Sequence, residues 1–269
     1  MSFEQFYSMN RNTFDKQHLE KDDAFISHDH REVIAGLHYL TNNKGLGVVT
    51  APCGSGKSFA IKCFMENLNP NLFTTAYITL STVTVLDFYK EICKALSLEE
   101  KGGKTGMYHK IKGHIFQLHN SLKRPLVMVV DEAQYLNRHI LKELKMLTNF
   151  KYDSKYCFTL ILCGEPDLLN TLNLDINEGL RQRIIYHYEF RGLSDDEVRE
   201  YIYHKLNIAG ASETIIGEDA LTAITAFAGG SARLIDKAMT SALTLGAQIG
   251  QATLNADTMK AALEDLSLV

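Results

Sequence analysis

The sequence predicts an α/β domain with a parallel, doubly wound sheet, followed by a small all-α lid domain. Between residues 28 and 166, short apolar runs alternate with segments of helical periodicity, and from Ser194 onward the periodicity is helical alone. A glycine-rich turn separates the first expected strand from the next helix, as in sheets that bind ligands at the carboxyl ends of their strands. We expect residues 1–192 to form an N-terminal arm and the α/β domain, and residues 193–269 to form the lid.

Each expected strand is a short apolar run bounded by Gly, Pro or charged residues, and each expected helix repeats its apolar residues at spacings of three and four. The first domain is expected to contain, in order, helix 28–42, strand 46–50, helix 58–68, strand 74–80, helix 85–96, helix 108–122, strand 125–130, helix 137–148 and strand 156–163. Three glycines close together predict a flexible loop over residues 99–106. The lid helices are expected at 194–208, 217–228, 231–249 and 255–266, and Ser194 and Glu197 form a capping box at the first of them.

Composition limits the class of protein. The chain has 269 residues, of which 45% are hydrophobic, enough for one large core or for a main domain with a smaller one. No run of 18 or more apolar residues is present, so no membrane span is expected, and residues 1–4 do not start a secretory signal. Five cysteines, an odd number without C-x-x-C spacing, predict reduced thiols and a cytoplasmic location.

Residues 51–58 read Ala-Pro-Cys-Gly-Ser-Gly-Lys-Ser, which is the phosphate-binding loop pattern with Ala51 in place of its first glycine. Backbone N–H groups of such a loop, with the start of the next helix, form a cradle for phosphates. We expect Lys57 to reach the β- and γ-phosphates and the Ser58 hydroxyl to bind Mg²⁺. The expected nucleotide-binding residues are Pro52, Cys53, Gly54, Ser55, Gly56, Lys57, Ser58 and Phe59. The alternatives are a chance glycine-rich turn and, for Cys53, a role as a small filler.

A second motif is the apolar run of residues 125–130 that ends in Asp131 and Glu132. The run is typical of a buried parallel strand. Asp131 is expected in the shell of the Mg²⁺ ion, and Glu132 is expected to polarise the water that attacks the γ-phosphate. Alone, such a run is common where a strand enters a solvated turn. Together with the phosphate loop it predicts an ATP hydrolase with ATP and Mg²⁺ as its cofactors.

Charge is distributed unevenly along the chain. The net charge is −4, which does not by itself suggest nucleic acid. However, residues 101–130 contain no acid and several Lys, Arg and His side chains, whereas acids outnumber bases after Leu193. A local basic face of this kind is typical of an anion-binding surface, and a solvated helix face is the alternative.

Several motifs in serial order resemble the ExeA-like branch of the AAA+ ATPases, which is similar to the transposition ATPases TnsC, TniB and MuB. The resemblance covers nearly the whole chain. The segments that carry it are Phe6-Tyr7 and Phe14, residues 131–136, 141–150, 164–169, 180–184, 193–194, 201–206 and 229–235. It implies a P-loop AAA+ ATPase fold with a small helical lid.

The resemblance also implies roles for two arginines. Arg183 resembles the arginine finger that reaches the γ-phosphate of a neighbouring subunit, with Arg181 as the alternative. Arg233 resembles the sensor-2 arginine that contacts the γ-phosphate in its own subunit. Both are permanent cations suited to phosphate oxygens, and a surface or salt-bridged arginine is the alternative for each. Glu165 departs from the family, because the relatives usually carry Gln there.

The function that the resemblance implies is that of a transposition regulator. Such an ATPase assembles into a ring or a helical filament on double-stranded DNA when ATP is bound, and it recruits or stimulates a transposase. The chain ends after the lid, without the membrane segment and cell-wall module of secretion-type ExeA proteins, and this favours transposition. The expected sequence-independent DNA contacts are Lys101, Lys104, Thr105, Thr82 and Thr84. The alternatives are an ATPase for secretion or envelope assembly and a nucleotide-dependent signalling switch that binds only protein.

Overall fold

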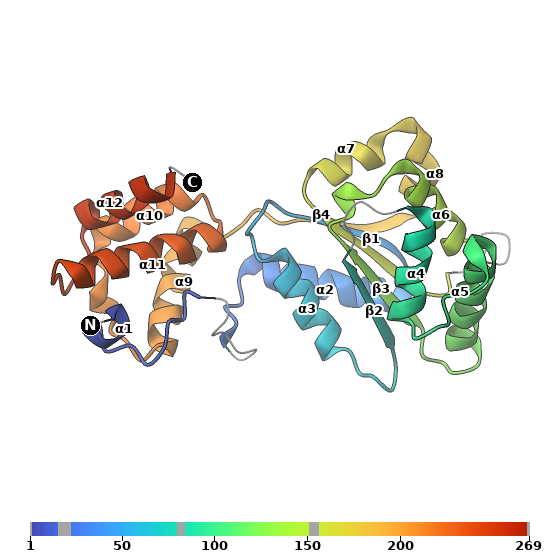
Figure 1. The fold of residues 1–269 in the computed structure, drawn as a ribbon, viewed down its shortest axis with the longest axis horizontal. Helices are drawn as coiled ribbons and strands as arrows, with labels where there is room; N and C mark the ends of the chain where they lie inside the picture. The colour runs from blue at the N-terminus through green and yellow to red at the C-terminus, as the bar shows by residue number, and fades with distance from the viewer. Residues whose placement is uncertain (1, 16–22, 80–83, 151–155, 268–269) are drawn as a thin grey trace. The chain divides into compact units, whose positions relative to one another are not determined.

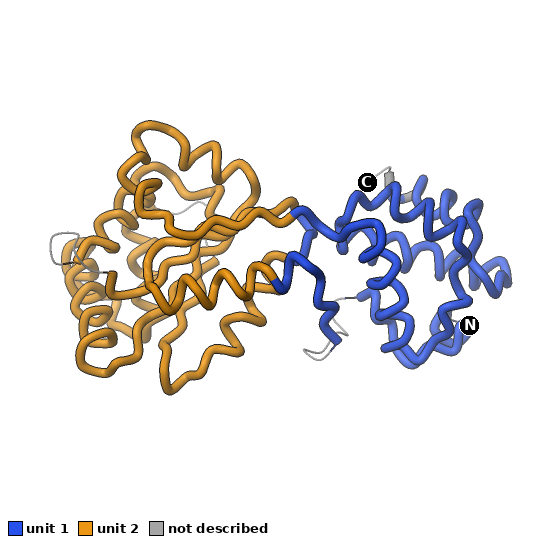
Figure 2. Tube along the Cα trace, turned by 180° about the vertical axis from the view of Figure 1, so that it is seen from behind, with its two compact units in different colours: residues 1–31, 53–56, 191–269 blue, residues 32–52, 57–190 orange. Residues whose placement is uncertain are grey.

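The computed structural model describes residues 2–15, 23–79, 84–150 and 156–267 (Figure 1). The chain forms two compact units, which Figure 2 shows in different colours. The sheet unit contains residues 32–52 and 57–190. The helical unit contains residues 1–31, 53–56 and 191–269. The short segment 53–56 therefore packs with the helical unit although its neighbours on both sides belong to the sheet unit.

The sheet unit is built on five parallel strands in the order β2-β3-β4-β1-β5. The strands are β1 (Gly45–Thr50), β2 (Thr74–Thr79), β3 (Leu126–Asp131), β4 (Thr159–Gly164) and β5 (Ile184–Glu189). The three central strands are buried along their whole length, whereas burial alternates along the edge strands β2 and β5. This pattern follows from covering both faces of a parallel sheet with helices.

Helices cover the two faces of the sheet (Figure 1). Residues of β1 and β3 that point to one face pack with residues of α4, α5, α6 and α7, and those that point to the other face pack with residues of α2 and α3. The helices are α2 (His28–Asn43), α3 (Lys57–Asn67), α4 (Val85–Ala95), α5 (Gly103–Asn120), α6 (Arg138–Thr148), α7 (Asp167–Asn173) and α8 (Glu178–Arg181).

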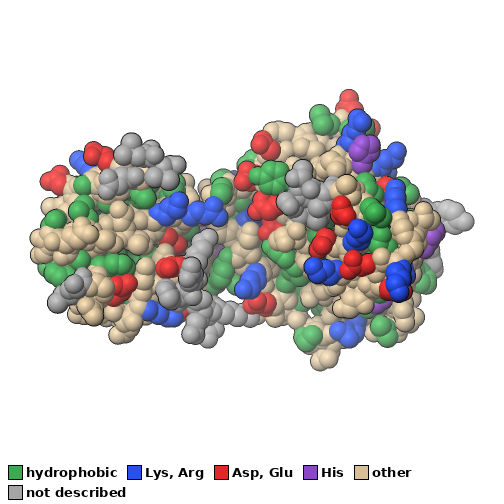
Figure 3. Space-filling model, in the orientation of Figure 1, with side chains coloured by type: hydrophobic (Ala, Val, Ile, Leu, Met, Phe, Trp, Pro, Cys, Tyr) green, Lys and Arg blue, Asp and Glu red, His purple; other side chains and the backbone are tan. Residues whose placement is uncertain are grey.

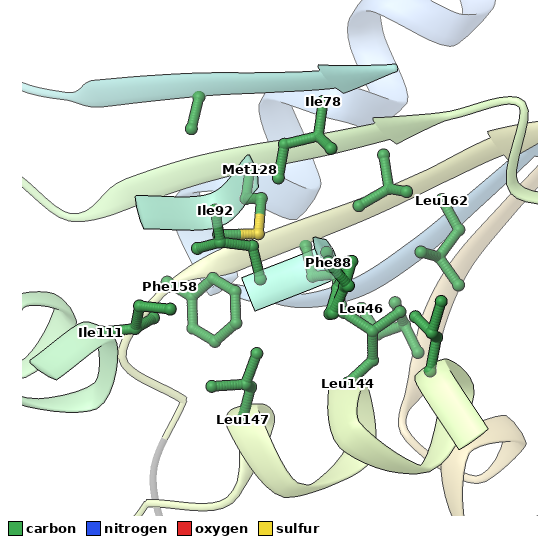
Figure 4. Packing of buried hydrophobic residues seen from close by; sticks show 14 of the residues in the cluster. Leu46, Ile78, Phe88, Ile92, Ile111, Met128, Leu144, Leu147, Phe158 and Leu162 are labelled. Atoms are coloured by element: carbon green, nitrogen blue, oxygen red, sulfur yellow. The ribbon is translucent and has the colours of Figure 1, made fainter. Parts of the chain in front are cut away.

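The larger core of the sheet unit lies under α4, α5 and α6 (Figure 4). Phe88 of α4, Leu144 of α6 and Ile111 of α5 are fully buried against Met128 and Leu162 of the sheet. The close-up shows these side chains converging on one layer between the strands and the helices. Burial of this layer fixes β3, and therefore the position of the acidic residues at its end.

The helical unit contains α1 (Phe3–Phe6), α9 (Asp195–Ile208), α10 (Glu218–Ala228), α11 (Ala232–Gln248) and α12 (Ala256–Ser267). Together with the sheet, this helical C-terminal part confirms the predicted fold class. Inside the unit Lys205 forms a buried ion pair of 2.7 Å with Asp236, which also accepts a hydrogen bond from the Tyr201 hydroxyl. A buried charge of this kind is tolerated because it is both paired and hydrogen-bonded.

The N-terminal arm differs from the expected division at residue 192. Tyr7, Met9 and Phe14 are buried in the core of the helical unit, and the Lys205 ammonium group lies 5.5 Å from the centre of the Phe14 ring. Residues 1–31 therefore belong to the helical unit and not to the sheet unit. Their aromatic side chains need apolar partners, and α9 and α11 provide them.

Several elements differ from the sequence expectation, and the helices α1, α7 and α8 were not predicted. The loop predicted over 99–106 is too long: residues 99–102 lie outside any helix or strand, but α5 begins at Gly103, with Gly102 as its N-cap in a left-handed conformation (φ 99°). The glycines that indicated a loop serve as the cap and the first turn. Strand β5 was not predicted because its sequence, IIYHYE, alternates as an edge strand does and contains no continuous apolar run. Within the described residues, no helix is both long and apolar enough to span a membrane.

The packing of this core predicts that truncating Phe88 strongly lowers the free energy of unfolding. Phe88→Ala is expected to lower the free energy of unfolding by about 3–5 kcal/mol, since it removes a fully buried ring and leaves a cavity. The matched control is Phe116→Ala on α5, whose residue is 41% exposed, with an expected loss of about 1 kcal/mol or less. Urea unfolding followed by circular dichroism measures both. Equal losses for the two variants contradict the packing described for α4.

Candidate functional site

The candidate site begins with Asp131, the buried last residue of β3. Its Oδ1 accepts a hydrogen bond of 2.9 Å from the Glu132 N–H and lies 3.7 Å from the Lys57 ammonium nitrogen. Its Oδ2 accepts a hydrogen bond from the Tyr77 hydroxyl. Burial and the hydrogen bond to Asp131 raise the pKa of Tyr77, so this hydroxyl remains a donor. The carboxylate is therefore held from three directions.

Lys57 is the first residue of α3 and is buried, whereas Ser58 and Phe59 beside it are exposed. Chain continuity joins Lys57 to the glycine-rich segment, so the first turn of α3 begins directly after the loop. The free N–H groups of such a first turn and the Lys57 cation both favour an anion. The structure thus brings Lys57 and Asp131 together, as the two motifs predict.

The loop segment 53–56 packs against the start of α11. The Arg233 N–H donates to the Gly54 carbonyl oxygen at 3.2 Å, and the Arg233 Nη1 lies 2.8 Å from the Cys53 Sγ. Gly54 has φ +83°, and a Cβ there would lie 2.7 Å from the Arg233 Cβ and 2.8 Å from the Ser231 Oγ. Only glycine fits this approach. The predicted loop residues and Arg233 therefore meet within the helical unit.

Glu132 follows Asp131 with a left-handed backbone (φ 54°, ψ 36°), which is strained for a residue with a side chain. Its Oε2 accepts a hydrogen bond of 2.7 Å from the Gln134 Nε2. Tyr77 and Gln134 contact the acids of the second motif, and the sequence patterns single out neither as a site residue. The nearest signal for Gln134 is its place two residues after Glu132. No sequence pattern could have identified Tyr77 as a site residue, because its partner Asp131 lies 54 residues further along the chain.

Arg183 directly precedes β5 and is half-buried. Its Nε donates to the Gly179 carbonyl oxygen at 3.1 Å, and the Nη1 of Arg181 donates to the Asn173 carbonyl oxygen at 2.9 Å. Each arginine is thus oriented by a backbone carbonyl of its own chain. Their roles as the arginine finger and its alternative stay predictions.

The predicted DNA contacts fall at two helix starts in the sheet unit. Lys101, Lys104 and Thr105 are exposed around the first turn of α5, which contains no acid and has no side-chain cap. Thr84 is the N-cap of α4, and its hydroxyl is hydrogen-bonded to Asp87. Thr82 lies outside the described residues.

The lysines of this region have partners within the chain. Lys101 pairs with Glu99 at 2.7 Å, and Lys104 pairs with the largely buried carboxylate of Glu143. Lys110 also contacts Glu99, at 3.5 Å. Figure 3 accordingly shows basic and acidic side chains interspersed on the visible face of the sheet unit. The acid-free sequence therefore does not give a uniformly basic surface, because acids from other segments reach it.

The donor set fits a Mg²⁺ ion shared with a nucleotide. Ser58 and Asp131 offer a hydroxyl and a carboxylate, and Mg²⁺ prefers such oxygen ligands. Within the described ranges, no group of three or more His, Cys, Asp or Glu side chains is placed to hold a metal ion. The remaining ligands would come from water and phosphate oxygens, and the bound ion would neutralise developing negative charge.

Comparison with known proteins agrees with this geometry. Residues 40–172 match the sequence model of the family described as an AAA domain. The chain is 31% identical over 229 residues to general secretion pathway protein A of Aeromonas hydrophila, a match that covers 82% of this chain and 42% of that protein. The chain thus spans less than half the length of this relative.

Solved structures of other proteins share the fold. Cdc6p of Pyrobaculum aerophilum has a TM-score of 0.69 at 16% identity, covering 94% of this chain and 70% of that chain. The Drosophila origin recognition complex bound to DNA has a TM-score of 0.68 at 15% identity, covering 98% of this chain and 65% of that chain. The fold is that of a P-loop AAA+ ATPase, and the chain contains an ATP-hydrolysing AAA domain.

The site predicts that Lys57→Ala loses most of the affinity for MgATP, since the cation that faces the phosphates is removed. Lys62→Ala is the matched control, because Lys62 lies on the same helix with an exposed side chain. Isothermal titration calorimetry measures both, after circular dichroism shows that each variant is folded. The folding check is needed because Lys57→Ala also leaves the buried Asp131 without its cation. Unchanged affinity in a folded Lys57→Ala would contradict the assignment.

Proposed function

We propose that this protein is an AAA+ ATPase that binds double-stranded DNA in an ATP-dependent, oligomeric form and recruits or stimulates a transposase. The ATPase part rests on the AAA domain and on the contacts of Asp131 with Lys57 and Glu132. The transposase is the partner implied by the resemblance to TnsC, TniB and MuB. A cytoplasmic location remains a prediction, and it agrees with the five cysteines, which form no disulfide in the described residues.

Within this proposal each residue has a role. Lys57 and the loop residues from Pro52 to Gly56 hold the phosphates, with Ser58 and Asp131 at the Mg²⁺ ion. Glu132 polarises the attacking water, and Phe59 lines the nucleotide site. Arg233 binds the γ-phosphate of its own subunit, and Arg183 binds that of a neighbour. The orientation of Arg183 by the Gly179 carbonyl supports this role, because a finger must be held in a fixed direction to act.

The observation that carries the DNA part is the exposed start of α5. Its first turn has no acid and no side-chain cap, Lys104 lies in that turn, and Lys101 lies two residues before it. Phosphate oxygens are the natural ligands of such a helix start. The Drosophila origin recognition complex, which shares the fold, is bound to DNA in its structure, and this agrees with a DNA-binding role for this fold. Thr84 contributes less, because Asp87 lies beside it in the first turn of α4.

The second candidate is an ATPase of a secretion system. It is favoured by the 31% identity to general secretion pathway protein A of Aeromonas hydrophila. The site itself serves either function, since both need ATP hydrolysis. The two differ in whether the ATP-bound protein binds DNA, so DNA binding is the measurement that separates them.

DNA binding is expected to require ATP and to fall steeply with salt, because each neutralised phosphate releases counterions. Fluorescence anisotropy of a labelled duplex across a salt series, with ATP or with ADP, measures it. The combined variant Lys101→Ala and Lys104→Gln should bind more weakly and with a flatter salt slope. Glutamine at 104 keeps a hydrogen-bond donor for Glu143, so the fold is preserved.

The control for this variant is Lys62→Ala with Lys260→Ala, which removes the same charge from two other exposed positions. If the two double variants bind DNA equally well, the DNA site does not lie at the start of α5. Absence of ATP-dependent DNA binding by the wild type at low salt rejects the transposition proposal and favours the secretion ATPase or the nucleotide-dependent signalling switch.

If two subunits share an ATP site, mixing two differently inactivated variants should restore ATP hydrolysis. Arg183→Ala should hydrolyse ATP about 10³-fold more slowly than the wild type while still binding it, by analogy with arginine fingers. Arg138→Ala, an exposed arginine on α6, is the control. Mixed with Lys57→Ala subunits, Arg183→Ala subunits should regain activity, since an intact ATP site then meets an intact arginine. No recovery in mixtures shown to co-assemble by cross-linking argues against a shared site.

A further inference from the structure

Gln134 connects the loop after β3 to the loop after β4. Its Nε2 donates to the Glu132 Oε2 at 2.7 Å, and its Oε1 accepts from the Glu165 N–H at 3.1 Å. All three residues belong to the sheet unit. We infer that Gln134 is a positioning residue for ATP hydrolysis, which holds the Glu132 carboxylate in the orientation that polarises the attacking water. This inference rests on the proposed role of Glu132.

The hydrogen-bond partners determine which partner the oxygen and which the NH₂ group of the Gln134 amide faces. A backbone N–H can only donate, so the Glu165 N–H requires the oxygen of the Gln134 amide. The NH₂ group is then directed to Glu132, whose ionised carboxylate can only accept. The orientation of the amide is therefore fixed by chemistry at both ends. A side chain of this length that lacked either the donor or the acceptor could not bind both Glu132 and the Glu165 N–H.

The backbone of Glu132 is fixed as well. Its left-handed conformation (φ 54°) is strained and persists only where the surroundings over-determine it. Here the Glu132 N–H donates to Asp131 at 2.9 Å, and the Glu132 carbonyl accepts from the Tyr135 N–H at 3.1 Å. Gln134 adds the third constraint, on the carboxylate itself. Without it, the side-chain torsions of Glu132 would remain free to rotate.

Gly164, the last residue of β4, leaves the space that Gln134 needs. A Cβ at position 164 would lie 2.7 Å from the Gln134 Oε1, 3.1 Å from its backbone nitrogen and 3.2 Å from the Leu168 Cδ2. The first distance is shorter than real Cβ contacts, and the backbone nitrogen and Leu168 leave little room to shift. The end of β4 thus has the shape that lets the amide reach the Glu165 N–H.

The consequence concerns the hydrolytic step. The water oxygen bonds to the γ-phosphorus, the bond to the β–γ bridging oxygen breaks with its electron pair leaving on ADP, and the water proton passes to Glu132. A base must lie within hydrogen-bond reach of that proton, and small misplacements reduce rates strongly. The Gln134 amide occupies the Oε2 atom and leaves the Oε1 atom for the water. It is neutral, so the carboxylate keeps its negative charge.

The test uses two variants that change the amide in different ways. Gln134→Met keeps the length of the side chain and removes both hydrogen bonds. Gln134→Glu keeps an acceptor for the Glu165 N–H but replaces the donor by a second carboxylate beside Glu132. Both should lower kcat about 10- to 100-fold, while KM and the calorimetric Kd for MgATP stay within about twofold of the wild type. Gln117→Met, at an exposed position of α5, should leave kcat unchanged.

A double-mutant cycle separates positioning from a merely structural role. If Gln134 acts through Glu132, then Gln134→Met should cause no further loss of kcat in a Glu132→Gln background. Gly164→Ala should lower kcat in the same way as Gln134→Met, since it displaces the amide without changing it. Circular dichroism and thermal unfolding check that each variant is folded.

Other outcomes overturn the inference. Wild-type kcat in Gln134→Met, with an active wild type, removes the positioning role and leaves the ATPase function intact. A higher kcat shows that Gln134 holds Glu132 back instead. An equal further loss in the Glu132→Gln background shows that Gln134 acts independently of Glu132. A wild type that neither binds nor hydrolyses ATP rejects the proposed function and this inference with it.

Discussion

The buried carboxylate of Asp131 is the constraint on which the rest of the site depends. A charge at the end of a fully buried strand is stable only when it is paired and hydrogen-bonded. Lys57, Tyr77 and the Glu132 N–H meet this need together. These partners come from α3, from β2 and from the residue after β3, so one carboxylate fixes how three segments lie at the edge of the sheet. Glu132, whose N–H is one of these partners, has the left-handed backbone described above.

A second constraint is the close approach of the backbone to a neighbouring side chain, which two glycines make possible. Gly54 lets the phosphate loop lie against Arg233, and Gly164 lets β4 end against Gln134. In each case the missing Cβ brings a side chain with hydrogen-bonding groups next to a backbone that a larger residue would keep away. The two contacts involve the two features that face the phosphates in the proposed function, namely the loop and the water-polarising acid. Their geometry is therefore set by the absence of side chains as much as by the presence of charged ones.

The sequence predicts the order of elements and the two acidic and glycine-rich motifs because these are local patterns. The central strands are continuous apolar runs, and the helices follow a regular period. What it does not predict depends on partners far along the chain. Strand β5 alternates like exposed sequence, Tyr77 meets Asp131 across 54 residues, and the Cys53 thiol meets Arg233 across 180. The N-terminal arm likewise shows its place only through the core that surrounds Phe14.

The charge pattern illustrates the same limit and bears on function. A stretch without acids in the sequence acquires them in the fold, because Glu99 and Glu143 reach Lys101, Lys104 and Lys110. A phosphate that binds these lysines must share or replace a carboxylate, so each contact contributes less than an unpaired lysine would. The helix start of α5 keeps its N–H groups available, yet one such site per subunit is weak. Under the proposed function, stable DNA binding would depend on several subunits acting on one duplex, and assembly, which needs the nucleotide, would control the interaction.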